Sequence, residues 1–216
     1  MITSKTPSTM IDVYYAPTPN GVKIPIALEE LGAPYRLVPV NLGREEQKRP
    51  DFLALNPNGR IPVIVDPDGP GGEPVSVFES GAILLYLADK FGGLMPSDPR
   101  ERIRALEYLF FQVGGVGPMF GQAGWFMRQP ERITVGIDRY QAESRRLTAV
   151  LETRLQKARW LAGESFSVAD IAHFGWLRVA DYAGVQLDHY PAVKDWLQRI
   201  ASRPAVQRAL HPVHAA

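Results

Sequence analysis

The stretch Asn56-Pro-Asn-Gly-Arg-Ile-Pro-Val-Ile-Val65 decides the fold that this chain is predicted to have. Its opening letters NPNG are typical of a turn, and IPVIV is typical of a β-strand that begins near a proline. A trans peptide bond is the default before proline, because only about 5–6% of X-Pro bonds in folded proteins are cis. Taken alone, Pro62 is therefore an ordinary edge-strand proline, and the flanking segments decide its interpretation.

A strand-helix-strand unit precedes this stretch. Residues Met10–Ala16 favour a strand, and the turn-prone letters PTPNG follow. Apolar residues then recur at helical spacing from Val22 to Gly32, a typical residue to close a helix. Tyr35–Val40 reads as a second strand, and a helical crossover between two strands makes them parallel.

Further elements are predicted on both sides of the stretch 56–65. Residues 44–55 are polar and predict a short helix, and 66–73 predict a turn between two strands. Val75–Phe78 alternates like a strand, and Glu79–Phe91 has the apolar face of a helix. The resulting order, βαβαββα, predicts a mixed four-stranded sheet with helices that closes near residue 92.

The rest of the chain is predicted to be helical. The Gly- and Pro-rich residues 92–99 predict a linker, beyond which no strand is expected. Helical patterns occupy 100–126, 131–159, 167–183, 192–202 and 204–211, the first of them interrupted near 114–121. We therefore expect an α/β domain over residues 10–92 and an all-α helical bundle over residues 99–216.

The composition limits the classes of partner. The 216 residues carry 24 Lys plus Arg against 23 Asp plus Glu, and the net charge of +1 argues against nucleic acid or an anionic membrane as partner. No apolar run reaches the roughly 20 residues that span a bilayer. Residues Met1–Thr9 lack the apolar core of a secretory signal, so a cytoplasmic protein is expected.

Cysteine is absent from the sequence, so neither a disulfide nor a thiolate metal site is available. The four histidines lack metal-ligand spacing, no metal is expected, and His173 is interpreted as a core residue. Any thiol chemistry must therefore use the sulfur of a bound small molecule.

Three segments together resemble the glutathione transferase superfamily: 56–65, 77–87 (VFESGAILLYL) and 167–172 (SVADIA). The resemblance runs from about Ile11 to Ala209 and implies a thioredoxin-like N-terminal domain followed by the helical bundle. Within the superfamily the chain resembles the bacterial Nu class, whose members are similar to yeast nitrogen-regulator-type transferases, at residues 16–21, 110–119 and 139–143.

The resemblance implies a glutathione site at Ile61-Pro62 and Glu79-Ser80. In such domains a cis-proline exposes the backbone of the preceding residue, here Ile61 with Arg60 beside it, which pairs with the cysteinyl main chain of glutathione. Ser80 would bind the γ-glutamyl carboxylate at a helix N-terminus, and Glu79 would bind the α-ammonium group. A plain helix cap is the alternative role for Ser80.

The resemblance also places Thr18 and Asn20 beside the glutathione sulfur, where their donors would stabilise the thiolate. Lowering the thiol pKa by about two units requires only roughly 2.7 kcal/mol, within reach of two or three donors. Turn or N-cap chemistry is the alternative for both residues. Tyr14 and Tyr15 belong to the first strand, where alternation would bury one of them, and are interpreted as structural.

Thr18 and Asn20 stand where other classes have a catalytic serine, tyrosine or cysteine. Nu-class relatives are linked to disulfide reduction with two glutathione molecules per site, so the resemblance implies a homodimeric enzyme that reduces a disulfide or attacks a small electrophile. Gln47 and Arg139 match glutathione contacts of that class, with Arg139 supplied by the neighbouring subunit. A solvated helix charge is the alternative for Arg139.

Two further motifs have mainly structural interpretations. Ser167–Asp170 is a capping box with a folding role, so Asp170 is not a catalytic candidate. The glycine-rich residues 114–121 leave room for close helix packing, or for a substrate pocket lined by Met119, Phe120, Trp125 and Phe126. A non-catalytic glutathione-binding or regulatory protein, a peroxidase and a dehalogenase are the alternative functions on this fold.

Overall fold

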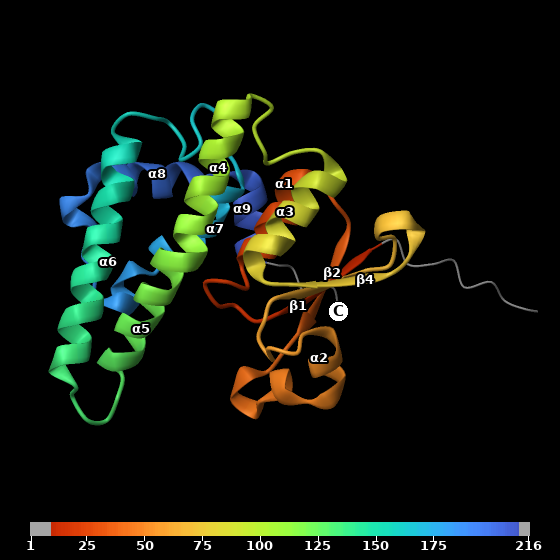
Figure 1. Ribbon diagram of the computed structural model, residues 1–216, viewed down its shortest axis with the longest axis horizontal. Helices are drawn as coiled ribbons and strands as arrows, with labels where there is room; N and C mark the ends of the chain where they lie inside the picture. Colours follow the sequence, from red (N-terminus) through yellow and green to blue (C-terminus); the bar gives the residue numbers. More distant parts are fainter. Residues whose placement is uncertain (1–9, 212–216) are drawn as a thin grey trace, which may run out of the picture.

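A computed structural model describes residues 10–211 in two adjoining parts (Figure 1). The first part holds β1 (Ile11–Tyr15), α1 (Lys23–Leu31), β2 (Tyr35–Pro39), α2 (Pro50–Leu55), β3 (Val63–Asp66), β4 (Val75–Phe78) and α3 (Ser80–Phe91). The second part holds α4 (Pro99–Phe111), α5 (Gly117–Met127), α6 (Thr134–Leu155), α7 (Val168–Leu177), α8 (Pro191–Ala201) and α9 (Pro204–Leu210). This order confirms the predicted α/β domain followed by a helical bundle.

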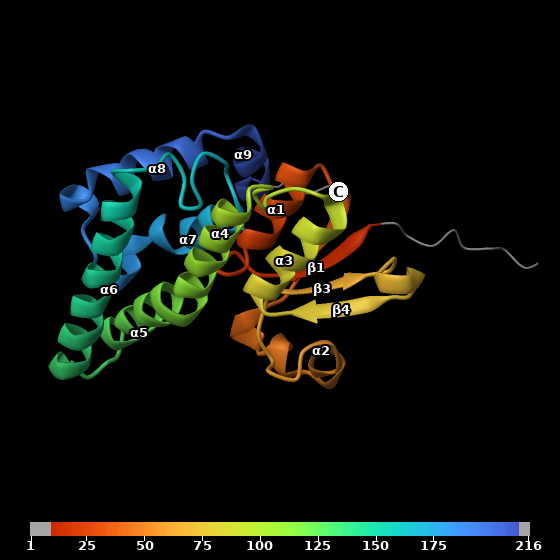
Figure 2. The same cartoon turned by 45° about the horizontal axis from the view of Figure 1, so that its top comes forward.

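The sheet is mixed, as predicted, with the strand order β2-β1-β3-β4. β1 is parallel to β2 and antiparallel to β3, and Val13 lies opposite Leu37 on one side and Ile64 on the other. Helices α1 and α3 cover one face of the sheet, and α2 covers the other (Figures 1 and 2). The sheet therefore lies between two helical layers.

Alternation along β1 sends successive side chains to opposite faces. Tyr15 packs on the main core, whereas Tyr14 meets Phe52 of α2 edge to face at a centroid distance of 6.0 Å. Both tyrosines are half-buried, so the expectation that alternation would bury one of them is wrong. Their structural interpretation agrees with this packing.

The connection from β2 to α2 differs from the predicted single helix over 44–55. It consists of two short 3₁₀ turns, Leu42–Arg44 and Glu46–Lys48, followed by α2. The Asn41 side chain accepts a hydrogen bond of 3.1 Å from the Arg44 N–H, so a local side-chain contact competes with a regular helix at its start. An α-helix is confirmed only over α2.

The predicted break in the first long helix is a π-helix instead. Residues Gln112–Val116 form a π-turn that joins α4 to α5 without ending the helix. A π-turn accommodates an extra residue and changes the direction in which the following side chains point. The glycines at 114 and 115 therefore lie within continuous helical structure.

The capping box at the start of α7 is confirmed, and Asp170 is fully buried. Its carboxylate accepts hydrogen bonds from the Ser167 N–H, the Leu161 N–H and the Trp196 indole at 2.9–3.0 Å. Burial raises the pKa of Asp170, and these bonds oppose that rise. The residue links three segments of the helical part, which agrees with the predicted folding role.

One main core runs through both parts of the molecule, from Leu28 of α1 to Trp196 of α8. A smaller cluster of Val40, Phe52 and Val63 lies under α2. The domain limits of 10–92 and 99–216 stay predictions. No helix within residues 10–211 combines the length and the apolar character needed to cross a membrane.

Candidate active site

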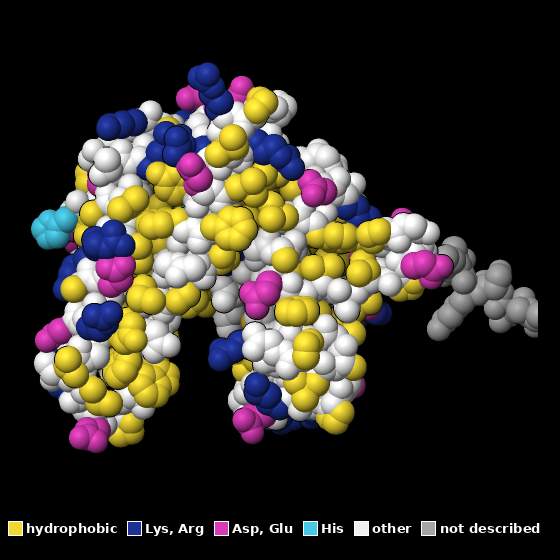
Figure 3. All heavy atoms as spheres, viewed as in Figure 1, with side chains coloured by type: hydrophobic (Ala, Val, Ile, Leu, Met, Phe, Trp, Pro, Cys, Tyr) yellow, Lys and Arg dark blue, Asp and Glu magenta, His cyan; other side chains and the backbone are white. Residues whose placement is uncertain are grey.

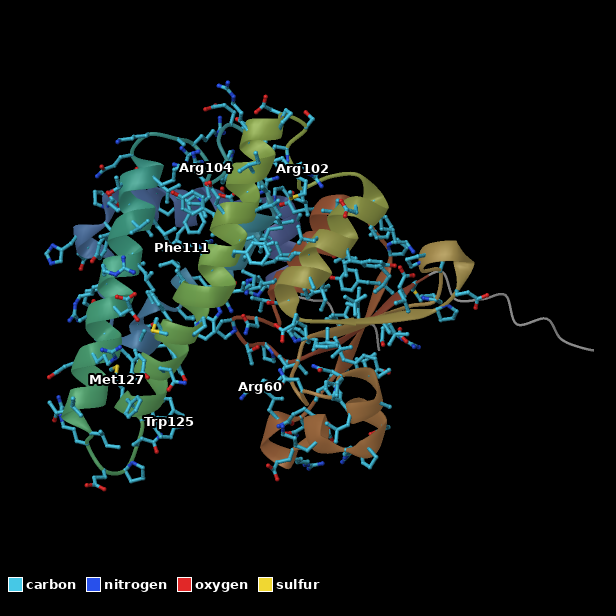
Figure 4. All side chains as sticks on the ribbon, viewed as in Figure 1. Arg60, Arg102, Arg104, Phe111, Trp125 and Met127 are labelled. Atoms are coloured by element: carbon cyan, nitrogen blue, oxygen red, sulfur yellow. The ribbon has the colours of Figure 1, made fainter. Side chains whose placement is uncertain are left out.

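Three cavities share Asn20 and Arg60 and together form the cleft of the described structure. The interdomain cavity, of about 680 Å³, lies between the two parts, and Figure 3 shows the notch between α5–α6 and the α2 side into which it opens. The turn cavity, of about 370 Å³, is lined by Thr18 and Gln47, and the loop cavity, of about 70 Å³, by Ser80. Figure 4 shows Arg60 and Trp125 on opposite sides of the notch.

The loop before β3 is built around the buried side chain of Asn56. Its Oδ1 accepts from the Asn58 N–H at 2.9 Å, and its Nδ2 donates to the Arg60 carbonyl at 2.7 Å. The Ile61–Pro62 peptide bond is cis, as the resemblance implied. Sheet pairing begins only at Val63, so Ile61 lies outside the strand ladder, at the edge of the turn and loop cavities.

Glu79 and Ser80 form the junction between β4 and α3. Glu79 is exposed and has φ 69° and ψ 115°, a conformation that costs a non-glycine residue on the order of 1–3 kcal/mol. Ser80 is the first residue of α3, is only 7% exposed and lines both the interdomain and the loop cavity. The first-turn N–H groups of a helix favour an anion, so this strained junction points an anion-binding end into the cleft.

Thr18 and Asn20 lie in the turn that leads into α1. Thr18 Oγ1 accepts from the Gly21 N–H at 3.1 Å, and Asn20 Oδ1 accepts from the Trp176 indole at 2.9 Å. The Thr18 hydroxyl proton and the Asn20 amide N–H groups are thereby left as donors for the cleft. The turn interpretation is correct, but the N-cap of α1 is Val22, so N-cap chemistry is not the role of either residue.

Gln47 lies at the cleft, whereas Arg139 lies away from it. Gln47 lines the turn cavity together with Thr18 and Ile61. Its Oε1 is buried and has no hydrogen-bond partner among residues 10–211. Arg139 is exposed on α6 and lines none of the three cavities, so a single chain does not bring it to the cleft.

The sequence analysis missed several cleft residues, among them Lys23, Gln112 and Trp176. Lys23 is fully buried, and its Nζ donates to Gln112 Oε1 at 2.7 Å and to Ser80 Oγ at 3.2 Å. Burial lowers the pKa of Lys23 to about 7, and the negative charge of Glu79 opposes this shift. A lysine inside the apolar run of α1 is a signal that could have been found, whereas Gln112 and Trp176 arrive only through tertiary packing.

The wall opposite the loops agrees only in part with the predicted substrate pocket. Trp125 lines the interdomain cavity, but Phe120 is 1% exposed and belongs to the core. Phe126 stacks on Tyr140, and neither it nor Met119 lines the cavity. The π-helix shifts the helical phase of α5, which is why another set of residues, Pro118, Gly121, Gln122 and Tyr182, completes this wall.

Comparison with protein families matches both parts of the chain. The family model described as "Glutathione S-transferase, N-terminal domain" matches residues 10–89, and that described as "Glutathione S-transferase, C-terminal domain" matches residues 126–204. The disulfide-bond oxidoreductase YfcG of Escherichia coli (strain K12) is 52% identical over 203 residues, covering 93% of this chain and 94% of the relative.

Solved structures give the same result. A glutathione transferase family member from Pseudomonas fluorescens pf-5, with two glutathione bound, has a TM-score of 0.90 and 42% identity over 96% of this chain and 95% of its own. A glutathione transferase from Pseudomonas putida, with one glutathione disulfide bound per subunit, has a TM-score of 0.88 and 42% identity, covering 98% of this chain and 94% of its own. The chain belongs to the glutathione S-transferase family.

Proposed function

We propose that this chain is a glutathione-dependent disulfide reductase in which bound glutathione supplies the reactive thiolate. The observation that carries the proposal is the convergence of Asn20, Ile61 and Ser80, from three separate segments, on one cleft. The name of the Escherichia coli relative and the ligands of the two Pseudomonas structures support it.

The ligand would lie along the loop before β3. Its cysteinyl main chain would pair with the backbone of Ile61, with Pro62 and Arg60 beside it, as an added strand pairs with a free edge. Its γ-glutamyl carboxylate would bind to Ser80 and the N-terminus of α3, and its α-ammonium group to Glu79. Gln47 of the turn cavity would then contact the opposite end of the tripeptide.

In this placement the thiol lies beside Thr18 and Asn20. The donors of these two residues stabilise the thiolate relative to the thiol and so lower the pKa of the bound sulfur. The thiolate attacks one sulfur of a disulfide and releases the other as a thiolate, which takes up a proton. A second glutathione thiolate then attacks the mixed disulfide, so two glutathione molecules become glutathione disulfide and the substrate leaves as two thiols.

The interdomain cavity offers space for the second reactant. Its volume of about 680 Å³ lies within the range of roughly 300–1,000 Å³ that is typical of small-molecule sites. Trp125, Tyr182 and Arg60 line it and would contact either a second glutathione or the disulfide substrate. No group of three or more metal-ligating side chains occurs in the described part of the chain, and no step requires a metal ion.

A homodimer is part of the proposal because α4 exposes an apolar face. Ile103 is 59% exposed and Phe110 is 64% exposed, and their seven-residue spacing places both on one side of the helix. A second subunit covering this face would bring its own α6, and with it Arg139, toward the cleft. We also propose a cytoplasmic location, because the reaction consumes reduced glutathione.

Disulfide reduction coupled to glutathione reductase tests the proposal. NADPH consumption with hydroxyethyl disulfide as substrate should require glutathione, and Thr18→Ala combined with Asn20→Ala should lower turnover by about tenfold or more. Thr153→Ala, which removes an exposed α6 hydroxyl bonded to the Ala149 carbonyl, is the matched control and should leave turnover unchanged. Unchanged turnover of the double variant would refute the assignment of Thr18 and Asn20. Glutathione binding without any turnover would favour a non-catalytic binding protein instead.

A further inference from the structure

Lys23 is a buried cation that lacks an anionic partner within the described structure. Its side chain is 0% exposed, and both of its hydrogen-bond acceptors, on Gln112 and Ser80, are neutral. No carboxylate among residues 10–211 lies within ion-pair distance of its ammonium group. A buried ammonium group lowers the free energy of unfolding unless it is paired, so a purely structural role is a poor explanation for this lysine.

The charged and titratable groups around Lys23 do not neutralise it. Glu79, before α3, is exposed, and Arg60 on the cleft wall has the same sign as Lys23. His173 of α7 is buried, and burial lowers its pKa to about 3, so it is neutral near pH 7. The acids of α1 are engaged elsewhere, in the ion pairs Glu29–Arg208 and Glu30–Arg203.

Lys23 also determines how the Ser80 hydroxyl is used. Because Ser80 Oγ accepts a hydrogen bond from Lys23 Nζ, its own proton must point to a different acceptor. Ser80 lines the interdomain and loop cavities, so that proton is available to a ligand there. Gln112, in the π-helix, holds the ammonium group from the helical part and keeps it beneath Ser80.

We propose that Lys23 is a positioning residue for the γ-glutamyl carboxylate of bound glutathione. Its ammonium group holds the Ser80 hydroxyl as a donor and places a positive charge beneath the carboxylate. The inference rests on the proposed function, in which Ser80 and the N-terminus of α3 bind this carboxylate. The helical part thereby contributes to affinity through Gln112, although the direct ligand contacts belong to the sheet part.

The test compares two ligands by isothermal titration calorimetry at about pH 6, below the folded-state pKa of Lys23, where its ammonium group is charged. The first is S-methylglutathione, and the second is its analogue with a carboxamide in place of the γ-glutamyl α-carboxylate. Lys23→Met should weaken binding of S-methylglutathione by about ten- to hundredfold and binding of the carboxamide analogue by less than about threefold. Because both ligands carry a blocked thiol, the readout is independent of catalysis.

Two further variants serve as controls. Lys90→Met removes a lysine that pairs with Asp66 at 2.6 Å and lines none of the three cavities, and it should change neither affinity. Lys23→Gln keeps a polar group but no charge, and it should show the same selective loss even if Lys23→Met folds poorly. Since Lys23 acts through Ser80, the losses caused by Lys23→Met and Ser80→Ala should be less than additive in the double variant.

The outcomes separate this inference from the proposed function. Equal weakening of both ligands, or unchanged binding of S-methylglutathione by both Lys23 variants, would overturn the positioning role and leave the proposed function standing. Failure of the unaltered protein to bind S-methylglutathione at millimolar concentration would overturn the proposed function and this inference with it.

Discussion

The indole Nε1 of Trp176 donates a hydrogen bond of 2.9 Å to Asn20 Oδ1, across 156 positions of sequence. Helix α7 approaches the turn closely enough for this bond because residue 175 is glycine, where a Cβ would collide with the Pro19 carbonyl oxygen. The bond holds the Asn20 amide with its N–H groups toward the cleft. The helical part therefore orients a side chain that the sheet part contributes.

Replacing Trp176 tests this orientation. Trp176→Phe keeps an aromatic ring but removes the donor, which frees the Asn20 amide to rotate. Turnover of a small disulfide should fall by about tenfold, the effect of losing roughly 1.4 kcal/mol of a positioned hydrogen bond. Trp160→Phe, at a buried tryptophan that lines none of the three cavities, is the control and should leave turnover unchanged. If Trp176→Phe retained full turnover, the bond would have no catalytic role.

The backbone conformation of Glu79 predicts that glycine is more stabilising than alanine at this position, the reverse of their usual order in a helix. At φ 69° glycine is less strained than a residue with a Cβ, so Glu79→Gly should be more stable to urea unfolding than Glu79→Ala by about 1 kcal/mol. At exposed Ala82 inside α3 the order is the usual one, and Ala82→Gly should destabilise by about 1 kcal/mol. Both Glu79 variants should bind glutathione more weakly, because both lack the carboxylate. Equal stability of the two Glu79 variants would argue against strain.

Lys23 predicts a pH dependence of stability. Its pKa is about 7 in the folded protein against 10.5 for the free side chain, so between these values the unfolded chain holds a proton that the folded chain has released. The free energy of unfolding should therefore rise with pH across this window, by at most about 1.4 kcal/mol per pH unit, and this contribution should be flat below it. Urea unfolding of the unaltered protein and of Lys23→Met, at about pH 6 and about pH 9, measures the difference. If the difference in free energy of unfolding between the two proteins were the same at both pH values, Lys23 would not have a lowered pKa in the folded protein.

The exposed face of α4 predicts a change in assembly. Phe110→Glu places a charge on this apolar face and should convert a dimer into a monomer, as measured by light scattering after size-exclusion chromatography. Gln198→Glu, which adds the same charge at an exposed residue of α8, is the control and should leave the mass unchanged. A monomeric mass for the unaltered protein would remove the homodimer, and the role of Arg139 with it.

Most of the fold could be predicted because its signals are local. Apolar spacing and a closing glycine define α1, and Gly32 indeed ends it with φ 63°. The 3₁₀ turns over 42–48 carry no periodic pattern, so sequence spacing alone could not separate them from a helix. Glycine disfavours helices, so the sequence predicts an interruption near 114–121, whereas the structure continues through the π-turn Gln112–Val116.

The site could be predicted only where its residues lie in short motifs. Ile61, Pro62, Glu79 and Ser80 belong to such segments, and the structure brings them to one cavity. Gln112 and Trp176 enter the cleft through the packing of the helical part against α1 and the preceding turn, a contact that no sequence pattern encodes. Lys23 was overlooked because helical periodicity marks which face is buried and does not indicate that a charge on that face has a function.

The link between Lys23 and Gln112 has a consequence for chimeras within this family. A helical part taken from a relative would bring a new wall for the disulfide substrate. It would also have to carry a hydrogen-bond acceptor for Lys23 at position 112, or the chimera would lose affinity for glutathione. Side chains that recognise a new disulfide or electrophile can therefore change more freely at Trp125 and Tyr182, which line the wall opposite the loops and are not bonded to Lys23.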